Sequence, residues 1–365
     1  MKKHLIAAAV AGAFAVPAMA QVTVSGLIDA GFYGTSSTVA AGTKSSTNII
    51  GTNERATSTI NFASTEDLGG GLKAGFRLEA NFANSIGSRG SSAGGVTAST
   101  SLTTSAPSSG FVLAQSFVEL SGGFGAIKIG RVNSPTLAAA GARSPFGTNT
   151  KGGGYGSTSG AGPTRNTAID YSTPSISGVS ARIHHSPKFQ SFAGARDSTA
   201  TTTAAQEAIT EVGLFYSAGP LSLAVANHDQ SRVEEQLTIS GSYNLGPARV
   251  WVGYHTRENS AAAPSTSLTH ATIFSSATEQ TGAKSKGYNV GVSIPLGAVS
   301  LLANTAKVEV KDRERGDGHA YGVGVDYALS KRTVAYFRHS QVESDESATT
   351  KNKATLTGVG ISHSF

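Results

Sequence analysis

The chain has 365 residues, 29 Lys and Arg against 23 Asp and Glu, and no cysteine. Charged residues make up only 14% of it, whereas ~25% is typical of soluble domains. The lack of cysteine excludes disulfides, thiolate metal sites and cysteine nucleophiles. The low charge argues against an ordinary cytosolic enzyme, and the mild basic excess lacks the clustered Lys and Arg of a nucleic-acid-binding protein.

The first twenty residues predict an export signal. They begin Met-Lys-Lys-His, continue with an apolar stretch over 5–16 and end Ala18-Met19-Ala20. A basic start, a short apolar middle and an Ala-x-Ala end are typical of a cleaved signal peptide. About twelve apolar residues are too few to cross ~30 Å of hydrocarbon as a helix, which disfavours an anchor. We therefore expect residues 1–20 to be removed and the mature chain to begin at Gln21.

From Gln21 onward, the sequence predicts strands. Residues 72–82 read Leu-Lys-Ala-Gly-Phe-Arg-Leu-Glu-Ala-Asn-Phe, and the same alternation of apolar and polar residues recurs at 56–62, 290–294 and 321–327. A period of two places apolar side chains on one face of a strand and polar side chains on the other. No long segment shows helical periodicity of comparable strength, so we predict an all-β chain.

Short and long connections alternate along the chain. Gly/Pro turns are expected at 67–71, 121–125, 173–178, 217–220, 244–247, 295–298 and 329–331, and long polar connections at 35–53, 84–112, 132–165, 187–209, 229–235, 257–285, 307–318 and 342–353. This layout predicts a transmembrane antiparallel β-barrel of about sixteen strands, with short periplasmic turns and long extracellular loops. A soluble sandwich or propeller would explain export and alternation, but not loops that are long on one side only.

A barrel of this size leaves a water-filled interior. The polar faces of the strands supply candidate lumen residues: Asp29, Arg55, Lys73, Arg77, Glu79, Glu119, Lys128, Asp170, Arg182 and Glu211. Charge at so many alternate positions indicates that water reaches this face, because unpaired charge in a dry core is prohibitively costly.

Five segments carry a resemblance that covers essentially the whole mature chain. They are 22–31, 64–69, 124–131, 165–171 and 358–365, the last ending in Phe365. In order and spacing they resemble the general trimeric porins of Gram-negative outer membranes, of the β-proteobacterial type found in neisserial and related bacteria. The resemblance implies a homotrimer, passive diffusion of small hydrophilic solutes, and a third long loop (132–165) that folds inward. It also implies outer-membrane lipid and lipopolysaccharide as surroundings, and assembly machinery that reads the C-terminal strand.

The resemblance further implies a constriction lined by arginines, for which Arg55, Arg77 and Arg131 match. Arg131 shares its parity with Ile127 and Ile129, so it would face lipid unless a bulge at Gly130 turns it inward. The loop 132–165 adds Arg143, Lys151 and Arg165 and has no Asp or Glu. A basic opening raises the local concentration of anions, so we predict moderate anion selectivity.

Three other functions are weaker, and we do not expect an enzyme. An outer-membrane hydrolase would need a nucleophile and a base, for which His184-His185 is the nearest hint, but no Gly-x-Ser-x-Gly or His-Glu-x-x-His motif occurs. A channel specific for an organic acid, a phosphate or a sugar would need an aligned path, and Phe117, Phe215 and Trp251 do not obviously align. An adhesin would also have long Ser/Thr/Gly loops. No cofactor or metal is expected.

Overall fold

The computed structural model describes residues 21–38, 42, 44–52, 54–81, 112–148, 165–188, 207–231, 233–259, 284–311, 317–345 and 351–365. The signal peptide expected at 1–20 and Lys151 lie outside them. Among the residues that the structure describes, one helix, α2 (Pro135–Gly141), interrupts a series of strands: β1 (Thr23–Thr38), β2 (Lys44–Gly51), β3 (Thr59–Gly69), β4 (Leu72–Asn81), β5 (Val112–Gly122), β6 (Gly125–Asn133), β7 (Arg165–Ser172), β8 (Val179–Ser186), β9 (Ile209–Ala218), β10 (Leu221–Gln230), β11 (Glu234–Asn244), β12 (Arg249–Asn259), β13 (Lys284–Leu296), β14 (Val299–Lys311), β15 (Gly318–Ala328), β16 (Thr333–Asp345) and β17 (Lys351–Ser364). Within the described residues, no helical segment has the length and apolar character needed to cross a bilayer.

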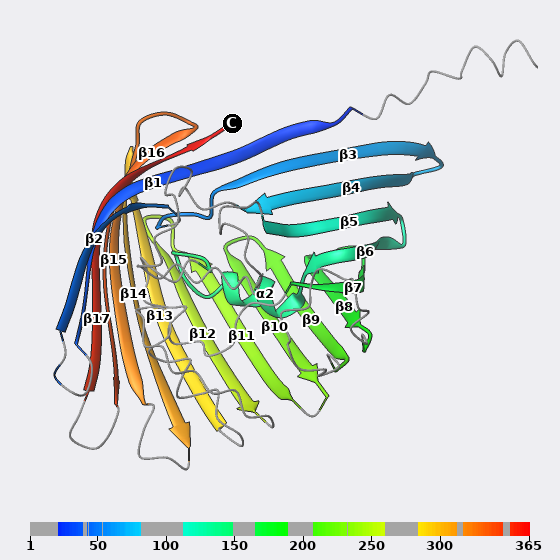
Figure 1. The fold of residues 1–365 in the computed structure, drawn as a ribbon. Coiled ribbons are helices and arrows are strands. Elements are labelled where there is room, and N and C mark those ends of the chain that lie inside the picture. The colour runs from blue at the N-terminus through cyan, green and yellow to red at the C-terminus, as the bar shows by residue number, and fades with distance from the viewer. Residues whose placement is uncertain are drawn as a thin grey trace, which may run out of the picture.

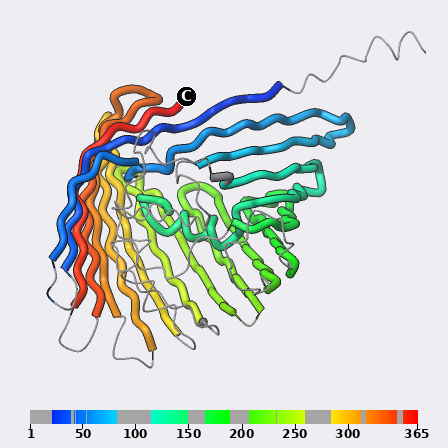
Figure 2. The backbone as a smooth tube through the Cα atoms, in the orientation of Figure 1, coloured from blue at the N-terminus to red at the C-terminus, as the bar shows by residue number. Residues whose placement is uncertain are grey.

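The strands form one closed antiparallel barrel (Figures 1 and 2). Neighbours in the chain pair from β3 onward, and β17 closes the ring by pairing with residues 27–38 of β1. The other edge of β1 is shared: residues 31–38 pair with β2 and residues 23–27 with β3. The ring therefore has sixteen strands, with β2 as an extra strand in line with β3, and the prediction of about sixteen strands is confirmed.

The two faces of the barrel differ as the alternation predicts. On β13, Val290 is 52% exposed on the outside, whereas its neighbours Asn289 and Gly291 are buried on the inside. Phe76 on β4 is likewise 40% exposed on the outside. A sheet that presents apolar side chains outward and polar ones inward suits a wall between lipid and water.

The seven tight turns all occur where the sequence predicts them, at one rim of the barrel. At the other rim, four of the predicted long connections are too long. Strands extend into 35–53, 229–235, 307–318 and 342–353, so that only residues 39–43, 231–233, 312–317 and 346–350 separate the paired strands there. The physical reason is that Ser, Thr and Lys pair in a ladder without the apolar signal that marks the membrane-facing part of a strand.

Candidate pore constriction

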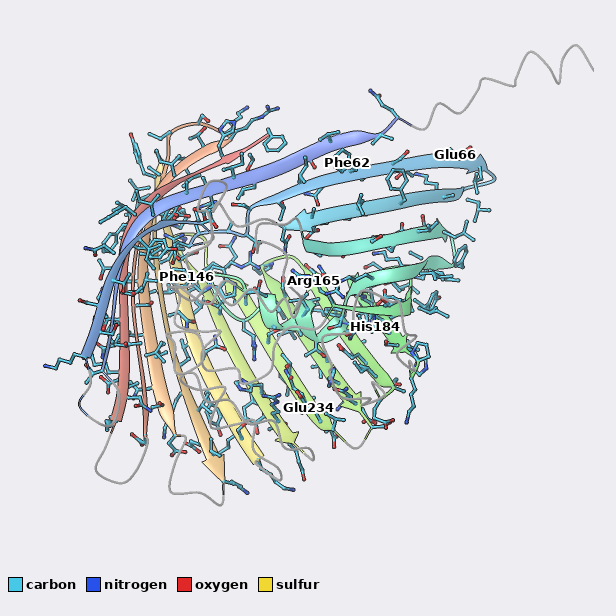
Figure 3. The ribbon with its side chains drawn as sticks, in the orientation of Figure 1. Phe62, Glu66, Phe146, Arg165, His184 and Glu234 are labelled. Atoms are coloured by element: carbon cyan, nitrogen blue, oxygen red, sulfur yellow. The ribbon has the colours of Figure 1, made fainter. Side chains whose placement is uncertain are left out.

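The described part of the third long connection lies inside the barrel, where Figure 3 shows Phe146 beside the wall. Ser134 begins α2 as its N-cap: its hydroxyl accepts a 3.2 Å hydrogen bond from the N–H of Leu137, and Pro135 follows in the first turn. Both features favour helix initiation at this position. The helix then packs against β9, β10 and β11, so the loop returns across the interior and not over the rim, as the resemblance implies.

Wall glycines make room for this loop at four positions on its path. At each, a Cβ atom would come within 2.5–3.0 Å of a loop side chain, which is too close for an unshifted contact; the pairs are Gly213 with Pro135, Gly253 with Arg143, Gly291 with Pro145 and Gly324 with Phe146. The glycines belong to β9, β12, β13 and β15. We call these four residues the glycine track. Its spacing across strands shows that the loop follows the wall from β9 to β15.

Polar contacts fix the loop to the same sector. Glu211 is buried and accepts hydrogen bonds from the N–H of Thr136 at 2.9 Å and from His228 at 2.9 Å. Further along, the amide of Asn289 donates to the carbonyl oxygen of Arg143 at 2.6 Å. Buried polar groups of a loop must find such partners, and here the wall strands supply them.

Arg143 differs from its predicted place. It was expected to line the opening, but its side chain is only 1% exposed. Its guanidinium lies 3.1 Å from Nδ1 of His255 on β12. Burial lowers the pKa of Arg143 to about 9, since desolvation disfavours the charged form. Arg143 therefore holds the loop against the wall and does not face the water of the lumen.

A first group of arginines lies on β4, β6 and β7, on the part of the wall that the described loop leaves uncovered. Arg77 is 43% exposed and donates to Glu79 at 2.8 Å. The Nε of Arg165 donates to Asn133 at 2.8 Å, and the charges of Glu79 and Arg131 both act on it. We call Arg77, Arg131 and Arg165 the first arginine group; Glu79 is the carboxylate that lies within it.

Arg131 joins this group without a bulge. The pairing of β6 with β5 and β7 continues through Gly130 without a shift in register. Instead, Gly130 has a φ of 134°, a backbone conformation that side chains of L-residues rarely adopt. The strand twists at this glycine, and Arg131 ends half-buried, with its charge acting on Arg165. Simple parity along the strand fails at this residue.

A second arginine group, Arg55 and Arg338, surrounds Asp326. The Nε of Arg55 lies 3.1 Å from the carboxylate of Asp326, and Nη1 of Arg338 lies 2.7 Å from it. Arg55 also donates to Ser362 at 3.0 Å. Phe146 from the loop covers Arg338, with its ring centre 5.4 Å from the guanidinium carbon. Sequence reasoning missed Asp326 and Arg338, although both have inward parity on β15 and β16.

Arg55 owes its position to the break between β2 and β3. Asp29 on β1 is buried, and its carboxylate accepts the backbone N–H groups of Arg55 and Ala56, each at 2.8 Å. Tyr336 donates to the other oxygen of the same carboxylate. Asp29, expected as a lumen residue, thus replaces the missing ladder hydrogen bonds and holds the break in place.

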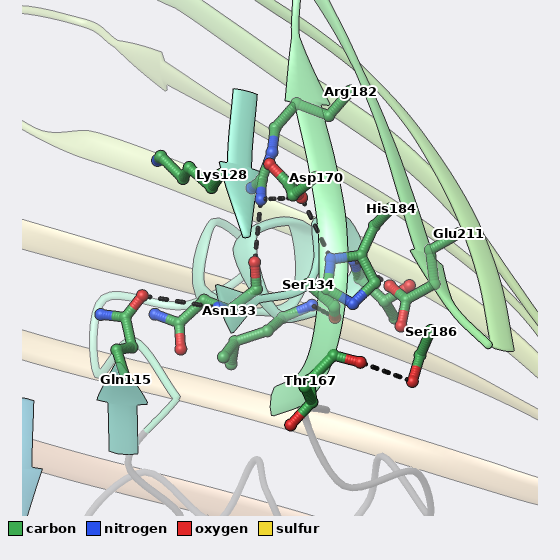
Figure 4. Close-up of polar contacts among 12 residues, drawn as sticks. Gln115, Lys128, Asn133, Ser134, Thr167, Asp170, Arg182, His184, Ser186 and Glu211 are labelled. Carbon is green, nitrogen blue, oxygen red and sulfur yellow. Dashed lines mark hydrogen bonds and ion pairs between the residues drawn. The ribbon is translucent and has the colours of Figure 1, made fainter. Parts of the chain in front are cut away.

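The remaining candidates form wall pairs. Asp170 accepts hydrogen bonds from Arg182 at 2.6 Å and from His184 at 3.1 Å (Figure 4). Arg182 also donates to the carbonyl oxygen of Asn133. Lys128 and Glu119 lie 3.4 Å apart on neighbouring strands. Lys73 is exposed beside the turn that joins β3 and β4. Of these, Asp170, Arg182 and His184 support the point at which the loop leaves β6.

Comparisons with known proteins agree with this architecture. The profile of the Gram-negative porin family matches residues 7–347. Outer membrane porin protein 32 of Delftia acidovorans is 28% identical over 358 residues, covering 92% of this chain and 88% of its own, and major outer membrane protein P.IB of Neisseria meningitidis serogroup B is 37% identical over 139 residues, 37% of this chain and 34% of its own. The solved anion-selective porin from Comamonas acidovorans superposes with a TM-score of 0.71 at 23% identity, over 95% of this chain and all of its own.

Proposed function

The chain belongs to the Gram-negative porin family, and from this premise we propose that its outer-membrane barrel is a general diffusion pore with moderate anion selectivity. Small hydrophilic solutes and ions pass through it without a binding step. Whether such a pore prefers anions or cations depends on the charged side chains of its own wall.

The observation that carries the selectivity is the balance of charge within the two arginine groups. The first places three guanidinium groups around the single carboxylate of Glu79, and the second places two around Asp326. The positive excess therefore lies in the first group, because Asp29 and Glu54 add further carboxylates beside the second. Fixed positive charge around a narrow aqueous passage raises the local concentration of anions and lowers that of cations.

We assign the constriction to Arg55, Arg77, Arg131 and Arg165, which share the barrel interior with the loop that follows the glycine track. Lys151 was also expected to line the constriction, but it lies outside the described residues. The loop's described part presents no carboxylate to oppose the wall, since residues 134–148 contain no Asp or Glu. Acidic residues in the loop would balance the charge of the arginines. Because the loop has none, the passage of anions is favoured.

We further propose a homotrimer in which residues 21–365 form the mature porin after removal of the signal peptide 1–20. Its surroundings are outer-membrane lipid and lipopolysaccharide, and the assembly machinery reads the C-terminal strand. The exchange of backbone hydrogen bonds between Phe365 and Gly26, at 3.0 and 3.1 Å, supports a closing role for this strand. We assign no catalytic role to the wall histidines, because His184 and His228 are occupied with buried carboxylates.

Reversal potentials in planar bilayers test the selectivity. Across a KCl gradient, the purified porin should give the sign of potential set by chloride, and a clear cation preference would overturn the proposal. Graded block of the current by one organic acid, phosphate or sugar would instead indicate a substrate-specific channel. Complete lack of conductance by the folded barrel would contradict both.

A further inference from the structure

The turn between β15 and β16 carries two adjacent cations, Lys331 and Arg332. Both side chains are exposed, and among the described residues neither forms an ion pair. The six other short turns, all within the described part of the chain, contain no Lys or Arg between their paired strands. Because the short turns of such a barrel face the periplasm, this positive charge lies at the inner leaflet of the outer membrane, in one sector of the rim.

The carboxylates of the same rim leave this charge in excess. Glu66 and Asp67 lie on β3, separated from β16 by β17 and β1. Asp326 points into the barrel, toward the second arginine group. The terminal carboxylate of Phe365 follows the adjacent strand β17, and one of its oxygens already accepts the N–H of Gly26 at 3.1 Å. Two cations beside this single carboxylate give the sector a net positive charge.

An apolar groove lies on the outer face of the barrel beside this turn. Two rows of directly paired residues cross the neighbouring strands β15, β16, β17 and β1 (Figure 1), and the short side chains of Ala30 and Ala335 leave space between larger ones. The groove has a volume of about 680 Å³, within the range of ~300–1,000 Å³ that is typical of ligand sites. We call it the rim groove; its two rows are Tyr327, Ala335, Ile361 and Ala30, and Val325, Phe337, Val359 and Phe32.

A hydrogen-bonding pair lies between the rim groove and the turn. Thr333 and His363 are directly opposite each other on β16 and β17, and the hydroxyl of Thr333 is 2.9 Å from Nδ1 of His363. Both share the outward parity of Ala335 and Ile361. Toward the rim, the outer surface thus changes from apolar, through hydrogen-bonding groups, to cationic. Acyl chains, ester groups and phosphate follow one another in the same order in a glycerophospholipid.

We propose that this surface binds an anionic glycerophospholipid of the inner leaflet. The phosphate lies against Lys331 and Arg332, the ester groups face Thr333 and His363, and one acyl chain occupies the rim groove. Each cation near an anionic membrane surface strengthens binding, whereas a zwitterionic headgroup has no net charge to attract. The inference rests on the location of the barrel in the outer membrane, but not on its ion selectivity.

Quenching of a tryptophan by brominated lipids tests this in the porin reconstituted into phosphatidylcholine vesicles. Trp251 on β12 is the only tryptophan of the chain, so Trp251→Phe gives a silent background. Tyr327→Trp places a reporter in the rim groove. Tyr243→Trp is the matched control, because Tyr243 is 46% exposed against 48% for Tyr327 and also lies two residues before an exposed turn leucine. Its turn, 245–248, has no Lys or Arg.

Brominated phosphatidylglycerol and brominated phosphatidylcholine are compared at both reporters. At the Tyr327→Trp reporter we expect the anionic lipid to bind at least about fivefold more strongly than the zwitterionic one, and at the Tyr243→Trp reporter we expect no preference. Lys331→Gln/Arg332→Gln should abolish the preference. Lys351→Gln/Lys353→Gln, which removes the same charge at the opposite end of β17, should retain it. Lack of any preference at the Tyr327→Trp reporter would overturn the proposal.

Three further results would also overturn it. Ala335→Leu fills the rim groove and keeps both cations, so an unchanged preference in this variant would reduce the effect to charge alone. Weak quenching by both lipids at the Tyr327→Trp reporter, with normal quenching at the Tyr243→Trp reporter, would show that a second copy of the chain covers the groove. An equal preference at both reporters would show that no single sector of the rim selects the lipid. Reversal potentials of the same variants should match that of the unmodified porin, so a failure of the proposed anion selectivity is seen separately.

Discussion

The carboxylate of Asp326 lies 3.1 Å from the Nε of Arg55, although 271 positions separate the two residues in the chain. The same carboxylate pairs with Arg338. Asp326 is therefore the negative charge that offsets the second arginine group. Its position leads us to expect that it tunes the anion selectivity proposed above.

Asp326→Asn should increase the preference for anions. The amide keeps the shape of the side chain but removes the carboxylate that pairs with Arg55 and Arg338, so the net positive charge beside the pore rises by one. We expect the anion-to-cation permeability ratio to rise at least about threefold, because a unit charge ~6 Å away in water changes the energy of an ion by ~0.7 kcal/mol, with opposite sign for anions and cations. Asp345→Asn at the outer rim is the control, and an equal change in both variants would show that local position is irrelevant.

Arg77→Gln should lower the anion preference and raise the conductance. The side chain of Arg77 is 43% exposed, against 26% for Arg55, so its removal takes away both charge and bulk. Arg143→Met removes the same charge from a buried site and should change selectivity less. Reversal potentials and single-channel currents in KCl give both quantities. A larger effect at Arg143 than at Arg77 would contradict the assignment of the constriction.

Gly291→Val should displace the loop without altering any charge. A Cβ atom there would meet the Cδ of Pro145 at 2.5 Å, and overpacking of this kind typically costs about 1–3 kcal/mol. The loop can move only toward the pore axis, so single-channel conductance should fall. Gly241→Ala, where the nearest neighbour is Leu223 and not the loop, should leave the conductance unchanged.

Glu211→Ala should loosen the start of the loop. It leaves the N–H of Thr136 and the ring of His228 without their buried acceptor, and each loss typically costs ~1–3 kcal/mol. We expect a lower midpoint of thermal unfolding and noisier single-channel currents. Glu211→Gln retains an acceptor oxygen and should recover part of the loss, whereas Glu235→Gln on the outer face should have little effect.

Much of this architecture follows from local sequence. The strict alternation in 72–82 places Arg77 and Glu79 on one face of β4, and the positions of Asp326 and Arg338 follow from the same rule, although they were not selected. The alternation rule does not place Arg131, because the preceding residue, Gly130, has a backbone conformation that residues other than glycine rarely adopt. It cannot place Arg143, whose contacts His255 and Asn289 are more than a hundred residues away in the chain.

The break between β2 and β3 ties the beginning of the chain to its end. Asp29 on β1 holds the backbone of Arg55, yet the partners that orient the guanidinium of Arg55 are Asp326 on β15 and Ser362 on β17. The proposed constriction is therefore completed only when β17 has paired with β1. A barrel in which β15 to β17 have not yet assembled lacks the residues that orient Arg55. We therefore expect the permeability of the pore to be set in the same step in which the barrel closes.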